Sequence, residues 1–141
     1  MAKKQKRIPR GVLNNNPGNI RINSDKFIGE IIPSRDGEFK QFDTMAHGYR
    51  AIFKILSNYY YKYSLKTIRQ MITRWAPPKE NHTDKYINYV ANAAGISADE
   101  TVNIKDMRLM IKLVGGMSKM ENGIEPDLIE IEDGWYMLYT E

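Results

Sequence analysis

Glu121 is the carboxylate whose position in the sequence best suits acid chemistry. It follows Val114 by seven residues and so continues the apolar side of a helix that should end at Asn122-Gly123. Burial and the negative end of the helix dipole both disfavour the charged form of this side chain. A carboxyl group that keeps its proton near neutral pH can act as a general acid. The alternative is a solvent-facing Glu at a frayed helix end, and the sequence leaves both open.

Glu80 is a second catalytic candidate, in the stretch RWAPPKEN. Two prolines stop one helix after Trp75, and the next helix should begin between Asn81 and Thr83. The dipole and free N–H groups of a helix start favour the anion, which suits a general base or a structural cap. Further carboxylates could face Glu121, and spacing alone does not choose among them: Glu30, Glu38 and Asp43.

The run NNNPGN, residues 14–19, carries amides that could hold a polar ligand. Asn-Pro and Pro-Gly are strong turn signals, so this stretch is expected to be a loop. The amides of Asn14, Asn15, Asn16 and Asn19 could bond the local backbone, or they could present donors and acceptors to a sugar.

Hydrophobic periodicity predicts the elements that must position these residues. Residues 20–42 have short apolar runs broken by turn residues, which indicates a small antiparallel meander with Asp36-Gly37 as its hairpin turn. The period then changes to about 3.6. A helix capped by Asp43 or Thr44 should bury one side as far as Tyr63. At least two of Tyr59, Tyr60, Tyr61 and Tyr63 must be core, because four tyrosines so close together cannot share one face.

Three more helices follow from the same periodicity. One spans residues 68–76, one ends at Gly95, and one has Asn103 as its cap and Asp106 in its first turn. Residues 126–141 fit either a helix or a hairpin, and Pro126 at a first helical position favours the helix. The expected class is α+β, mostly α.

Composition describes an ordinary folded domain with an uneven charge distribution. The 141 residues suffice for one domain, taken as 10–141, preceded by a basic arm over 1–9. The net charge is +4, yet residues 121–141 hold seven acids and no Lys or Arg. There is no Cys, and the two His lack metal-ligand spacing, so no metal or other cofactor is expected. We expect synthesis in the cytoplasm without a signal peptide, and no membrane insertion.

Several stretches together resemble a family of small phage and prophage proteins described as virion proteins or as lysozyme-like, peptidoglycan-degrading enzymes. They are Arg10-Gly11 followed by NNNPGNIR, then Phe39 to Phe42, GYRA, RWAPPKENHTDKYI and KMENGIEP, and together they cover about Arg10 to Pro126. A second similarity is to lytic transglycosylases of the goose-lysozyme type, whose catalytic Glu lies in a helix-ending segment that Glu121 to Pro126 resembles. In those enzymes this Glu precedes the other motifs. Either the order is permuted here, or another acid does the work.

The resemblance implies a lysozyme-like domain that cuts the β-1,4 glycan strand of peptidoglycan, by hydrolysis or by transglycosylation. It implies Glu121 or Glu80 as the catalytic acid. It also implies a set of residues that bind the glycan: Asn14, Asn15, Asn16, Asn19, Arg50, Tyr60, Trp75, Asn81 and Tyr86. The alternatives are a non-catalytic virion protein with this fold and, least favoured, a nucleic-acid-binding protein that uses the basic arm. Peptidoglycan and other virion proteins are the expected partners, with the protein associated with the virion or released to the cell wall.

Overall fold

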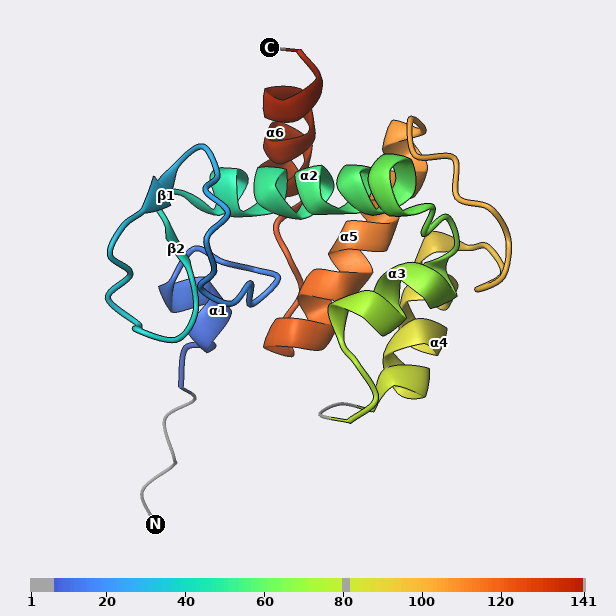
Figure 1. Ribbon diagram of the computed structural model, residues 1–141, viewed down its shortest axis with the longest axis horizontal. Helices are drawn as coiled ribbons and strands as arrows, with labels where there is room; N and C mark the ends of the chain where they lie inside the picture. The colour runs from blue at the N-terminus through green and yellow to red at the C-terminus, as the bar shows by residue number, and fades with distance from the viewer. Residues whose placement is uncertain (1–6, 80–81, 141) are drawn as a thin grey trace.

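The structure, a computed structural model, describes residues 7–79 and 82–140 and is mostly helical in that part (Figure 1). The expected basic arm over 1–9 is therefore described only from residue 7 on. The elements are α1 (Arg10–Leu13), β1 (Glu30–Ile31), β2 (Gln41–Phe42), α2 (Met45–Tyr63), α3 (Ile68–Trp75), α4 (Thr83–Ala94), α5 (Met107–Asn122) and α6 (Leu128–Tyr139). The α+β, mostly α class is confirmed. Within the described residues, no helix is both long and apolar enough to cross a membrane.

The predicted meander is present only as a short antiparallel pair. Glu30 pairs with Phe42, and an isolated bridge between Arg21 and Phe39 extends the contact. Asp36-Gly37 lies in the connection between the strands, but it is not a tight two-residue turn. The Asp36 carboxylate accepts hydrogen bonds from the backbone N–H groups of Glu38 and Phe39, so a side chain closes this loop.

The helices lie where the periodicity places them, and two of the predicted helix starts are wrong. Thr44 caps α2 by accepting from the His47 N–H, as predicted. The cap of α5 is Asp106, not Asn103, and the Asp106 carboxylate accepts from the Leu109 N–H at 3.1 Å. Residues 128–139 do form a helix, but Asp127 caps it and Pro126 lies outside. An ionised carboxylate is as good a cap as Asn, and each predicted start is followed by one: Asp106 three residues after Asn103, and Asp127 directly after Pro126.

The core lies between α2 and the helices that cross it. Helix α2 buries Tyr49, Ile52, Phe53 and Leu56, while Tyr63 at its last turn is exposed, contrary to the predicted apolar side. Tyr59 and Tyr60 are partly buried against the core. Helix α6 packs on α2 and α4 packs on α5 (Figure 1). These contacts hold α2 and the end of α5 in fixed positions, and both contribute to the site described next.

Candidate active site

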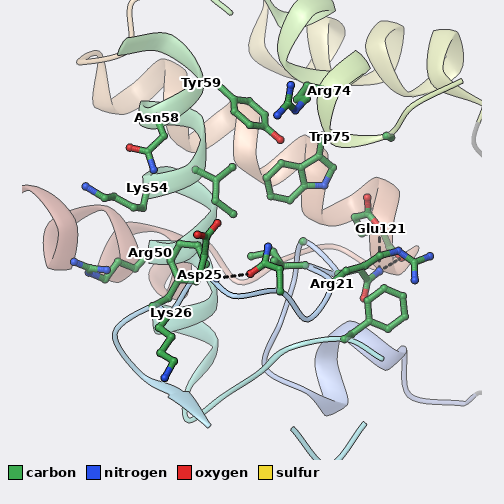
Figure 2. Close-up of a pocket in the computed structure, with 18 of the residues that line it drawn as sticks. Arg21, Asp25, Lys26, Arg50, Lys54, Asn58, Tyr59, Arg74, Trp75 and Glu121 are labelled. Carbon is green, nitrogen blue, oxygen red and sulfur yellow. Dashed lines mark hydrogen bonds between the residues drawn. The ribbon is translucent and has the colours of Figure 1, made fainter. Parts of the chain in front are cut away.

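A cleft of about 990 Å³ runs along α2 and is closed on its other side by α3 and the end of α5. Residues 18–28 of the loop before β1 form its remaining wall. Figure 2 shows Arg50, Lys54 and Asn58 along α2, with Trp75 and Glu121 across from them. The predicted acid Glu121 therefore lies on the wall of an open cleft and not on the solvent-facing side of α5.

Three hydrogen bonds hold the Glu121 carboxyl group. The Asn19 amide donates to Oε1 at 3.0 Å, and the Tyr86 hydroxyl donates to Oε2 at 2.9 Å. The Trp75 indole N–H is a third donor. Burial raises the pKa of Glu121 above its ordinary value, although these hydrogen bonds oppose the rise. Burial and the neighbouring carboxyl group likewise hold the pKa of Tyr86 well above its usual range.

The structure thus places three of the residues predicted to bind glycan around the predicted acid. Asn19, Trp75 and Tyr86 come from three separate parts of the chain, and each reaches the same carboxyl group. Gly18 makes the approach of Trp75 possible, because a Cβ at that position would lie 2.7 Å from the Trp75 ring. The sequence motif identified these residues but contained no information on their mutual contact.

The other three asparagines of the NNNPGN run bond to neighbouring parts of the protein, and none of them is among the residues that line the cleft. Asn16 is fully buried, and its amide joins the Ile20 backbone and the Lys40 carbonyl. Asn14 is buried and donates to Asp36. Asn15 donates to the carbonyls of Phe42 and Asp43. Backbone groups next to this loop need partners, and these amides supply them.

Of the remaining predicted site residues, one lines the cleft, one does not, and two lie outside the described part of the chain. Arg50 lines the cleft, although its residue surface is only 7% exposed. Tyr60 does not line it, because its ring packs against Tyr61 and lies under the Lys66 ammonium. Glu80 and Asn81 lie outside the described residues.

None of the described carboxylates predicted to face Glu121 reaches the cleft. Glu30 pairs with Lys40, Glu38 pairs with Arg10 and Arg21, and Asp43 binds His47. Among the described residues, Asp25 is the acid that shares the cleft with Glu121 (Figure 2). The sequence does not point to Asp25, since an acid in an irregular loop carries no periodic signal.

Asn122 is a further site residue that the sequence pattern does not reveal. Its amide donates to the Pro17 carbonyl at 2.9 Å and to the Ser118 carbonyl at 3.0 Å. This contact ties the end of α5 to the Pro-Gly turn, and so it holds Asn19 beside Glu121. Its only signal in the sequence is the adjacency to Glu121 at a helix end, which does not reveal a partner so far away in the chain.

Comparison with known proteins identifies the family of the chain. No family model matches it. It is 42% identical over 120 residues to Protein P5 of Pseudoalteromonas phage PM2, and the alignment covers 83% of this chain and 73% of the phage protein. Among the described residues, no group of three or more His, Asp or Glu side chains is arranged to hold a metal ion. On the extent and identity of that alignment, the chain belongs to the family of Protein P5 of phage PM2.

Proposed function

We propose that this protein cleaves the β-1,4 glycan strand of peptidoglycan with Glu121 as its general acid. The observation that carries the proposal is the Glu121 carboxyl group itself, which lines an open cleft and has a pKa raised by burial. A carboxyl group with a raised pKa keeps its proton to higher pH, and departure of a sugar oxygen requires a proton donor. We propose, in addition, that the fold is lysozyme-like, with helices and a small sheet around the cleft.

The contacts of Glu121 suit a group that changes its protonation state during the reaction. Asn19 carries both a donor and an acceptor, and the Tyr86 hydroxyl can donate or accept. Both side chains can therefore bond either form of the carboxyl group after a small rotation. The Trp75 N–H only donates, and so it favours the carboxylate that follows proton transfer.

The reaction we propose is transglycosylation. Protonated Glu121 donates to the glycosidic oxygen while the C1–O bond breaks and the sugar gains oxocarbenium character. The carboxylate then removes the proton from the 6-hydroxyl of the same sugar, whose oxygen bonds to C1. The product is an anhydro-sugar, and Glu121 regains its proton. Asp25 is the described carboxylate that could instead support attack by water.

A bacteriophage relative is consistent with this function, because phages must breach the cell wall to enter or leave a cell. We accordingly propose that the protein is associated with the virion or released to the wall. The alternative is a virion protein that retains the cleft but does no chemistry. Binding of nucleic acid through the basic arm is the least supported function.

Release of soluble fragments from purified peptidoglycan tests the proposal. Wild type, Glu121→Gln, Glu80→Gln and Asp25→Asn should be compared, with products identified by mass. We expect anhydro-sugar products from wild type, loss of about a thousandfold or more in Glu121→Gln, and near-normal release by Asp25→Asn. Loss in Asp25→Asn together with reducing-end products would replace transglycosylation by hydrolysis. Loss in Glu80→Gln alone would move the acid to Glu80. If no wall preparation is cut at any pH, the protein is a non-catalytic virion protein.

A further inference from the structure

One row of side chains on α2 gives the cleft a cationic wall. Arg50, Lys54, Asn58 and Lys62 follow one another at intervals of four residues, and all four line the cleft. Residues four apart are neighbours on one side of a helix, so these form a continuous row about 18 Å long, from the rise of 1.5 Å per residue. A second row lies beside it, with Ile55, Tyr59 and Tyr63. The cleft thus has a polar row and an apolar row along the same helix.

The charges around the cleft do not balance. Six cationic side chains line it: Arg21, Lys26, Arg50, Lys54, Lys62 and Arg74. Of these, Arg21 pairs with Glu38 outside the cleft. The acids among the described lining residues are Asp25 and Glu121, and burial disfavours the charged form of Glu121. No ion pair within the described part of the chain involves Lys54 or Lys62. A cleft lined by one sign of charge attracts ligands of the opposite sign.

The aromatic rings of the cleft favour a glycan over nucleic acid as that anionic ligand. Proteins that bind single-stranded nucleic acid offer ring faces on which bases stack. Here two guanidinium groups lie over the Phe39 ring, those of Arg10 and Arg21, at 4.6 and 5.0 Å. The Arg74 guanidinium lies over the Tyr63 ring at 5.5 Å. Of the other rings that line the cleft, Tyr59 and Trp75 pack edge to face with centroids 6.4 Å apart, and Phe27 lies against Phe42 and the Lys40 ammonium. Amides such as Asn58 remain along the cleft for hydroxyl and N-acetyl groups.

We propose that this cleft selects glycan strands whose substituents carry free carboxylates, and that Lys54 and Lys62 determine this selection. The inference rests on the proposed function and names the substrate class of the same site. The sugar rings lie against Ile55 and Tyr59, and the carboxylates of lactyl or peptide substituents pair with the lysines. Neutral amino-sugar oligomers fit the cleft but lack that pairing.

Binding to an inactivated enzyme separates this proposal from the question of cleavage. In the full-length Glu121→Gln background, affinity would be measured for soluble uncross-linked peptidoglycan strands with stem peptides, for N-acetylglucosamine oligomers of equal length and for single-stranded DNA. The test variant adds Lys54→Gln and Lys62→Gln. The control adds Lys112→Gln, an exposed lysine of α5 that is not among the residues lining the cleft. Circular dichroism confirms folding of each variant.

We expect the double substitution to weaken binding of the anionic strands by about tenfold, because each solvated ion pair contributes up to about 1 kcal/mol. Rising salt should weaken wild-type binding in the same way, and the control should match its parent. Affinity for the neutral oligomers should be lower and unaffected. Equal affinity for both glycans, or no loss in the double variant, would overturn the proposal. DNA binding that exceeds glycan binding and disappears in the double variant would assign the cleft to nucleic acid. Selective binding without any cleavage by wild type would uphold this inference while the proposed chemistry fails.

Discussion

Replacing Lys40 with Met should destabilise the protein and loosen one wall of the cleft. The Lys40 side chain is 0% exposed and that of Glu30 is 6% exposed, and the ammonium lies 3.0 Å from a Glu30 oxygen. The same ammonium donates to the Asp25 backbone carbonyl at 2.7 Å. Because Asp25 and its neighbours form part of the cleft wall, this buried pair links the small sheet to the site.

The size of the effect follows from burial. Met fills the volume of the lysine stem but leaves the Glu30 carboxylate without its counter-charge, which costs about 3–5 kcal/mol in comparable buried pairs. A domain of this size has a free energy of unfolding of about 5–15 kcal/mol, so the loss is a large share of it. Adding Glu30→Gln removes the uncompensated charge. The Gln side-chain oxygen can still accept the hydrogen bond that the Phe27 N–H donates to Glu30 Oε1 at 3.2 Å. The double variant should therefore recover about 2 kcal/mol.

Urea unfolding of wild type, both single variants and the double variant measures these differences. The slope of the free energy of unfolding against urea concentration should be the same in all variants, so that shifts of the transition midpoint report changes in stability alone. Amide exchange at residues 23–28 should increase in Lys40→Met, because the carbonyl of Asp25 loses its donor. If Lys40→Met and the double variant are equally stable within about 0.5 kcal/mol, Glu30 is not an uncompensated buried charge and the reasoning is wrong.

Three further predictions concern the site and the helix that carries its acid. The folded-state pKa of Glu121 is raised, so the protonated side chain stabilises the fold fully below the unfolded pKa, and this stabilisation is lost as pH rises through the folded pKa. Relative to wild type, Glu121→Gln should therefore gain stability in thermal melts between about pH 4 and about pH 8. A difference in stability that does not change with pH would contradict the raised pKa. Gly18→Ala should displace the Trp75 ring, lower the free energy of unfolding by about 1–3 kcal/mol and change the tryptophan fluorescence, whereas an unchanged spectrum would show that the ring has room. Asp106→Ala should cost about 1 kcal/mol in urea unfolding through loss of the α5 cap, and Asp106→Asn should retain most of the stability; equal losses in the two would refute the cap.

The sequence determined the helices of this protein because their signals are local. Thr44, Ala76 and Gly123 mark helix ends through backbone and side-chain chemistry that acts within one turn. Helical period also aligned Glu121 with Val114 on the apolar side of α5, but the sequence left open whether its carboxyl group is buried or faces solvent. Where two local signals competed, as at Asn103 and Asp106, periodicity could not choose between them.

Tertiary structure alone decided which side chains meet. Asn19 and Glu121 are 102 residues apart in the chain, and no local pattern encodes their hydrogen bond. The same holds for the asparagine run, where Asn16 became core and Asn19 reached the acid, because that division depends on how the loop packs against β2 and α5. The row of Arg50, Lys54 and Lys62 was present in the sequence, but a row of cations on a helix is ordinary until the fold places a cleft beside it. Local chemistry fixes the elements, whereas a site requires the long-range packing that brings them together.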